Sequence, residues 1–313
     1  MSRYITHLIE DCRDSSENGD FTTTTGIQDR EFIRYLTEGQ QRLHNLITQQ
    51  HAYVFEEEKI YTLSRKQETV TLPDNIHVKN MVVKVEYSFS GLEEDYKALD
   101  ITSSRNRYSN VDGVPEYFFV SNNKVYLVPT PGQPSPKLRV TYVRKSHSLN
   151  KRMAKVSSVT LSGNTISSLS VDVSTVGVDN TSLERADEHF TVVDSLGNIK
   201  CNAVRFSSLD TATGLVTINS LYEKDDSETI EVGDWIISGQ SSSSHIDANL
   251  TDMSERYLEA FCIYKIFKRD SSVDSQEQLV ELQALEEEII NSYKEVIHDV
   301  YTVPIINNQG DWW

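Results

Sequence analysis

The stretch VKNMVVKVEY, residues 78–87, carries the strongest strand signal in the chain, and the fold prediction is built outward from it. Its apolar side chains are mostly β-branched and alternate with polar ones, which suits a pleated, half-buried strand. Pro73 lies shortly before it and interrupts any ladder, because proline has no backbone N–H. Two more alternating stretches follow at 124–128 and 138–142. We therefore predict a small antiparallel β unit between residues 52 and 144.

On the N-terminal side of this unit the apolar residues change to helical spacing, in the segments Tyr4–Cys12 and Phe32–Ile47. Thr25 with Gln28 resembles a capping box, so we expect the second helix to begin near Thr25. Gly39 lies inside that helix and predicts either a bend or close packing there, because glycine is a poor helix former.

On the C-terminal side, helices are expected to begin at Asp252 and Asp274, each followed three residues later by a glutamate. In the second of these, apolar residues recur at steps of three and four from Leu279 to Val300. Its other face is predicted to be an acidic stripe of Glu281, Glu286, Glu287, Glu288 and Glu295. We expect the helices from both ends of the chain to pack into one helical core.

Residues 147–249 have a different texture, rich in Ser, Thr, Val and Asp, with short strands separated by glycine-containing turns. This pattern indicates an inserted β-sandwich or β-barrel, and Ser241–Ser244 is interpreted as its flexible exit linker. The predicted fold class is α+β: helices plus a small antiparallel β-sheet at 1–146, the inserted module at 147–249, C-terminal helices that complete the first domain at 250–301, and an extended tail at 302–313.

Composition excludes several classes of function. The chain has 313 residues and a formal charge of −17, from 30 Lys and Arg against 47 Asp and Glu. A chain this acidic does not suit binding to nucleic acid phosphates or to anionic lipids. No stretch approaches the ~20 apolar residues of a membrane helix. Three widely separated cysteines predict no disulfide framework, which fits an intracellular product.

A search for catalytic and metal-binding motifs leaves two weak candidates. Ser148 and Lys151 match a bare Ser-x-x-Lys pattern, for which we favour a solvated linker. An acidic cluster lacks the spacing of a calcium loop and is interpreted as a solvated loop: Asp225, Asp226, Glu228, Glu231 and Asp234. We expect no enzymatic activity, no metal and no cofactor.

The last residues suggest a partner. Trp312 and Trp313 end a tail that also contains Pro304, Ile305 and Ile306. Large exposed aromatic residues are unfavourable unless something covers them, and buried tryptophans are frequent interface anchors. We expect these residues to dock on another protein; packing against the chain itself is the alternative.

A series of short motifs in the β unit carries a family resemblance. Gly113-Val114-Pro115 is followed by the strand 124–128, by Pro129-Thr130-Pro131, and by a strand that ends in Tyr142. In this order, together with the flanking helices, the motifs resemble the head-to-tail adaptor (connector) proteins of short-tailed bacteriophages. The resemblance covers residues 1–145 and 250–313. Residues 147–249 are an insertion that many such proteins lack, and we expect it to project from the assembly toward tail or collar proteins.

The resemblance implies a structural virion protein at the head-to-tail junction, assembled in the host cytoplasm. The family forms a homo-oligomeric ring of twelve copies beneath the portal protein, extends the channel for DNA ejection and attaches the tail or nozzle proteins. The C-terminal tail would dock on the portal. Double-stranded DNA would pass without specific binding, because an acidic wall does not hold phosphates. We expect contacts between copies from the two long helices, through Phe32, Leu36, Leu43, Leu282, Ile289 and Tyr293.

Two other functions stay open at the level of sequence. The chain could be another neck or tail protein, such as a nozzle, tube or collar subunit, which would not bind the portal directly. It could also be a carbohydrate-binding protein that acts through the inserted module, although no pair of carboxylates marks a site.

Overall fold

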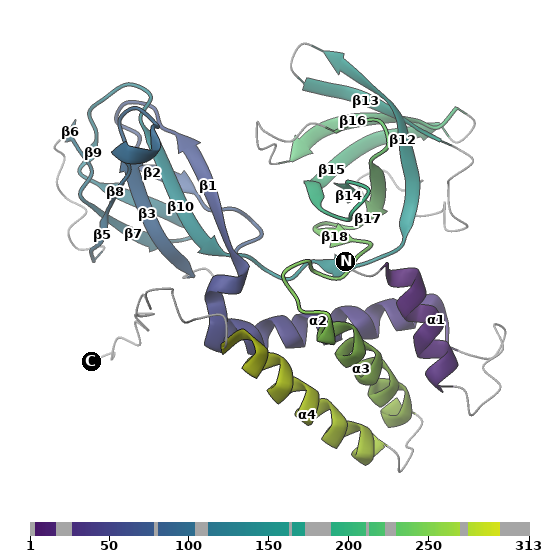
Figure 1. Ribbon diagram of the computed structural model, residues 1–313. Coiled ribbons are helices and arrows are strands. Elements are labelled where there is room, and N and C mark those ends of the chain that lie inside the picture. The colour runs from purple at the N-terminus through teal and green to yellow at the C-terminus, as the bar shows by residue number, and fades with distance from the viewer. Residues whose placement is uncertain are drawn as a thin grey trace. The chain divides into compact units, whose positions relative to one another are not determined.

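The computed structural model has mixed α+β architecture (Figure 1). It describes residues 4–16, 27–77, 81–103, 112–162, 165–172, 189–210, 213–222, 230–269 and 275–294. N-terminal and C-terminal helices combine with several mainly antiparallel sheets, so the predicted fold class is confirmed at this level. The chain divides into two compact units: residues 1–46 with 146–292, and residues 47–145 with 293–313.

The first unit contains most of the helical residues. Its helices are α1 (Ile5–Ser16), α2 (Asp29–His51, which continues into the second unit), α3 (Met253–Arg269) and α4 (Ser275–Lys294, which ends there). α2 begins at Asp29 rather than near Thr25, which lies outside the described residues. Most of the described residues of the predicted stripes are buried, because each helix removes its apolar face from water, and residues 295–300 of the last stripe lie outside the described residues.

Gly39 shows why α2 and α3 approach so closely. A Cβ atom at this position would lie 2.9 Å from Phe261 Cδ1 and 3.1 Å from Leu258 Cδ2. The close packing predicted as one alternative for Gly39 is therefore what the structure contains, because only a residue without a side chain leaves room for these two groups.

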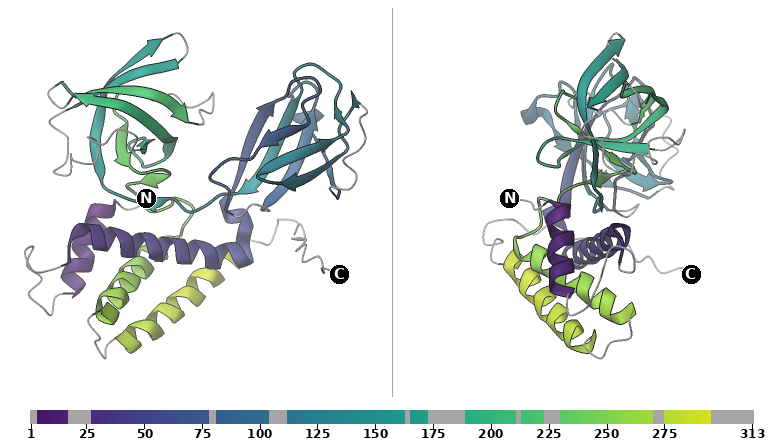
Figure 2. Two further views of the ribbon diagram at one scale, coloured as in Figure 1. Left: turned by 180° about the vertical axis from the view of Figure 1, so that it is seen from behind. Right: turned by 90° about the vertical axis from the view of Figure 1, so that its right-hand side faces the viewer.

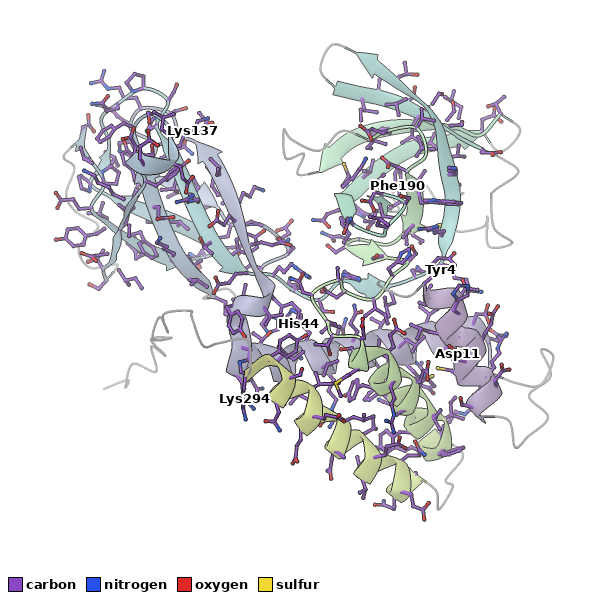
Figure 3. All side chains as sticks on the ribbon, viewed as in Figure 1. Tyr4, Asp11, His44, Lys137, Phe190 and Lys294 are labelled. Carbon is purple, nitrogen blue, oxygen red and sulfur yellow. The ribbon has the colours of Figure 1, made fainter. Side chains whose placement is uncertain are left out.

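Six strands form the β module, here called the insert. Their hydrogen-bonded order is β12-β13-β16-β15-β14-β17, and β17 also pairs with β12, so the pairings close on themselves. Apolar side chains fill the space inside, among them Phe190, which is 1% exposed and is labelled in Figure 3. The strands are β12 (Arg152–Ser162), β13 (Thr165–Asp172), β14 (His189–Val193), β15 (Ile199–Asp210), β16 (Leu215–Tyr222) and β17 (Trp235–Ser238).

The chain enters and leaves the insert side by side. β11 (Ser148–Leu149) pairs in parallel with β18 (Ser242–Ser243). Ser243 is 1% exposed and Ser244 is 0% exposed, so the interpretation of this serine run as a flexible linker is wrong. Serine hydroxyls can satisfy one another and the nearby backbone, which allows a polar connection to be buried.

The second unit contains two packed sheets, here called the sandwich, which the left view of Figure 2 shows from behind. One sheet has the order β1-β10-β3-β4 and the other β2-β8-β7-β5. The β unit predicted from residues 78–87 thus contains two layers rather than one. Its strands are β1 (Glu56–Thr62), β2 (Thr69–Thr71), β3 (Val82–Ser88), β4 (Lys97–Ala98), β5 (Asp100–Ile101), β7 (Tyr117–Ser121), β8 (Lys124–Val128) and β10 (Lys137–Val143).

Short elements complete the sandwich. β6 (Asp112–Gly113) pairs with β9 (Thr130–Pro131), and two 3₁₀ turns lie at Ala52–Phe55 and Glu93–Asp95. The core between the layers is apolar, and Leu138 and Val140 are both 0% exposed there. The described helices include none long and apolar enough to cross a membrane.

Candidate functional site

The six side chains predicted to join copies of the chain are buried within a single copy. Leu36, Leu43, Leu282 and Ile289 are 0% exposed, Phe32 is 2% and Tyr293 is 8% exposed. A side chain that its own chain has already covered has no surface left for a neighbour. These residues stabilise the protomer, and any contact with another copy through α2 or α4 would use the exposed faces of the helices instead.

The predicted docking residues of the tail, Pro304, Ile305, Ile306, Trp312 and Trp313, lie outside the described residues. Their role stays a prediction.

Gln40 on α2 is 0% exposed, and its amide forms three hydrogen bonds. Its Nε2 donates to the carbonyl oxygen of His147 at 2.9 Å and to Ser146 Oγ at 3.2 Å. Its Oε1 accepts the backbone N–H of Asp247 at 3.1 Å. One amide therefore binds both the chain that enters the insert and the chain that leaves it.

Thr37 lies one turn before Gln40 and strengthens the same junction. Its hydroxyl accepts the N–H of Leu149 at 3.1 Å and lies 3.4 Å from the carbonyl oxygen of that residue. Thr37 and Gln40 on α2 thus hold the two connections of the insert by hydrogen bonds, where a flexible linker was predicted. Sequence reasoning missed this clamp. The available signal was Gln40 itself, a polar residue four positions after Leu36 and three before Leu43 on the apolar stripe.

A second polar cluster surrounds His245, next to the same junction. The carbonyl oxygen of His245 accepts a hydrogen bond from His147 Nε2 at 2.9 Å, and its ring packs against Tyr4 at the start of α1 (Figure 3). Burial, together with the nearby positive charge of Arg152, lowers the pKa of His245 to about 4. His245 is therefore neutral at pH 7, and its neutral form is part of the attachment between α1 and the insert.

The acidic stripe predicted on α4 is interrupted at Glu286. This side chain is only 12% exposed and forms an ion pair with Arg42 Nε at 2.8 Å. It also accepts the Tyr257 hydroxyl at 2.9 Å. The prediction that Glu286 belongs to the acidic face opposite the apolar stripe is wrong, because its position in α4 turns it toward Arg42 of α2 and Tyr257 of α3. Glu287 and Glu288 are exposed, and Glu295 lies outside the described residues.

The two weak chemical candidates have structural partners. Lys151 forms an ion pair with Asp29, and Ser148 belongs to the buried β11–β18 connection. In the acidic cluster, Lys200 Nζ lies 3.1 Å from Asp234 and 3.3 Å from Glu231, while Asp225, Asp226 and Glu228 are outside the described residues. Among the described residues, no group of three or more acidic, His or Cys side chains could hold a metal ion.

The motifs that carry the family resemblance come together in the sandwich. Gly113 pairs with Pro131, and its carbonyl oxygen accepts the N–H of Gly132 at 2.9 Å. A Cβ atom on Gly113 would lie 3.1 Å from Pro129 Cγ, so the glycine permits the proline-rich turn to pack against it. Tyr142 lies on β10, where its hydroxyl donates to Glu57 at 3.1 Å. These residues have structural roles in one compact unit.

Comparisons with known proteins add no relative. No protein-family model matches the sequence, and no curated protein matches it significantly.

Proposed function

We propose that this chain is a structural virion protein, a head-to-tail adaptor that forms a ring beneath the portal, extends the DNA channel and attaches the tail. The observation that carries the proposal is the order and the common location of the motifs at Gly113, Pro129–Pro131 and Tyr142 in one sandwich. Ordered short motifs that build one packing unit are better evidence of a shared architecture than the same motifs scattered over a chain.

The way the insert is attached supports the same proposal. In an adaptor that carries an inserted module, the module has to be held in a fixed position on the rest of the protein. Gln40 and Thr37 hold both connections of the insert on α2, so the attachment is rigid rather than tethered. We assign residues 147–249 to a module that contacts tail or collar proteins.

The burial of the six predicted contact residues changes how the ring is built. The helical face available for a neighbouring copy includes Val280, which is 67% exposed on α4, and the exposed Glu287 and Glu288. The docking of the tail at 302–313 on the portal remains part of the proposal.

Binding to the portal tests the proposal and separates it from the alternative of a distal neck or tail subunit. The full chain and the portal protein of the same virus are mixed, and mass and symmetry are measured by native mass spectrometry and cryo-microscopy. An adaptor gives a ring of fixed copy number on the portal. The absence of any complex with the assembled portal would overturn the assignment.

Removal of residues 302–313 tests the docking tail separately. We expect the truncated chain to fold and to lose portal binding by at least about tenfold, because two tryptophan anchors contribute roughly 2 kcal/mol or more each. The control replaces Asn307 and Asn308, inside the same segment, by serine. Unchanged portal affinity of the truncated chain would remove the tail from the interface.

A further inference from the structure

One edge of the sandwich is unpaired along a whole strand. Among the described residues, β1 pairs only with β10. Phe55 O accepts the N–H of Arg144, and Leu63 N–H donates to Pro136 O, so the odd-numbered residues of β1 turn their backbone groups toward β10. Backbone direction alternates along a strand, so Glu56, Glu58, Ile60 and Thr62 present their N–H and C=O groups at the open edge.

The side chains of these four residues are also exposed, and they give the edge a chemical character. Ile60 is 53% exposed, and neither Glu56 nor Glu58 forms an ion pair with a described residue. Desolvation and the repulsion from Glu58 both raise the pKa of Glu56. Glu57, on the inner face, contrasts with them: its carboxylate binds Arg144 at 3.0 Å and Asn75 at 3.1 Å. The edge thus displays two carboxylates beside one exposed apolar side chain, and of the two Glu58 also lies near Arg139 and the Thr141 hydroxyl.

At the opposite edge of the same sandwich, no further strand pairs among the residues that the structure describes. Residues 97–101 run along it, pairing first with β3 of one sheet and then with β7 of the other. Leu99 N–H donates to Val85 O, and Asp100 N–H donates to Glu116 O. By the same alternation, Ala98 and Ile101 turn their backbone groups away from the sandwich.

This second edge has the complementary side chains. Lys97 is exposed and forms no ion pair with a described residue, and Ile101 is 58% exposed. The first edge therefore offers carboxylates and an isoleucine, and the second a lysine and an isoleucine.

We propose that the β1 edge of one copy binds the edge formed by residues 97–101 of a second copy, so that the sheets continue from subunit to subunit. The inference rests on the proposed ring, for which it names the contact. Electrostatic repulsion between like charges favours this contact over the pairing of two β1 edges. Two copies of a strand with the sequence EEEKIYT would bring like charges together, which destabilises a strand pair. Pairing of unlike edges leaves one open edge on each copy for the next, so it can close into a ring.

A proline at Ile60 tests the open edge with little cost to the fold. No described residue accepts the N–H of Ile60, and proline is tolerated on edge strands in this position. We expect Ile60→Pro to keep the circular dichroism and melting temperature of the wild type and to weaken self-association by at least about tenfold, because it removes a donor at the contact. The matched variant Tyr61→Pro loses a bond to β10 and is expected to destabilise the sandwich.

Charge reversal in trans tests the identity of the second edge. Glu56→Lys with Glu58→Lys in one chain, and Lys97→Glu in another, should each weaken self-association when measured alone by native mass spectrometry of the full chain. An equal mixture of the two variants should form mixed assemblies that contain both, because the reversed charges now match. Failure of the mixture to associate would overturn the pairing of these two edges.

The outcomes separate this inference from the proposed function. A ring on the portal whose copy number and affinity are unchanged by Ile60→Pro and by charge reversal overturns the edge contact and leaves the adaptor proposal standing. Self-association that depends on both edges, without any binding to the portal, supports the edge contact and overturns the adaptor. A wild-type chain that stays monomeric at high concentration, both alone and with the portal, overturns the edge contact.

Discussion

The insert and the sandwich are both built from β-strands, yet their strand edges differ. Each of the six strands of the insert has two hydrogen-bonded neighbours. The sandwich ends in β1 and β2 on one side and in β4 and β5 on the other. An open edge is a template for another chain, whereas a closed circle of pairings offers none. Among the described strands, the comparison places the edges available for strand pairing in the sandwich rather than in the insert.

The largest expected effect tests whether the two modules unfold independently. Phe190→Ala empties the centre of the insert, where this ring is 1% exposed, and should destabilise it by about 3–5 kcal/mol. Hydrogen exchange followed by mass spectrometry should show the loss of protection in residues 152–238 and not in β1, β3 or β10. Leu138→Ala in the sandwich should give the reverse pattern. Equal loss of protection in both modules from either variant would mean that they form one cooperative unit.

The next effect concerns the clamp. Gln40→Ala leaves the carbonyl oxygen of His147 and the N–H of Asp247 without the Gln40 amide as a partner. We therefore expect the free energy of unfolding to fall by about 2–3 kcal/mol. Exchange should increase first at the connections around β11 and β18. Gln41→Ala, one residue along on the exposed face of α2, is the control and should be close to neutral. A clamp variant that resembles this control would show that other contacts hold the insert.

A smaller effect is expected at Gly39. Gly39→Ala gains about 1 kcal/mol of helix propensity, but its new methyl group meets Phe261 at 2.9 Å. The steric cost of the methyl group should exceed the gain in helix propensity. We expect the free energy of unfolding, measured by urea denaturation, to fall by about 1–2 kcal/mol. Asn45→Ala on the exposed side of the same helix should be neutral or slightly stabilising. A stabilised Gly39→Ala chain would mean that α2 and α3 separate without cost.

The smallest effect is a pH dependence confined to the first unit. The pKa of His245 is about 4 in the folded chain and about 6.5 when unfolded, so the unfolded state binds more protons between these values. Stability should be level above pH 6.5 and fall as the pH is lowered toward 4, by on the order of 1 kcal/mol between pH 7 and 5. His245→Asn should flatten this slope relative to wild type. An unchanged slope in His245→Asn would assign the acid sensitivity to other groups.

Local patterns predicted much of this structure. The helical stripes around Leu36 and Leu282 and the alternating strands at 124–128 and 138–142 are found where the spacing predicted them. These segments could be predicted because burial on one face leaves a period in the sequence. The contacts of the polar groups could not be predicted. Helical spacing places Gln40 in a core without naming its partner, and it places Glu286 on an acidic face although Glu286 pairs with Arg42.

The sequence by itself determined the order of helices and strands, the apolar faces that each must bury and the acidic balance of the chain, because these depend on neighbours a few residues apart. Only the tertiary structure decided which strands keep an open edge and which carboxylates form ion pairs with basic side chains. It also decided that a single glutamine holds both ends of the insert. Those outcomes depend on residues distant in the chain, such as Gln40 with His147 and Asp247, and no local period records such pairs.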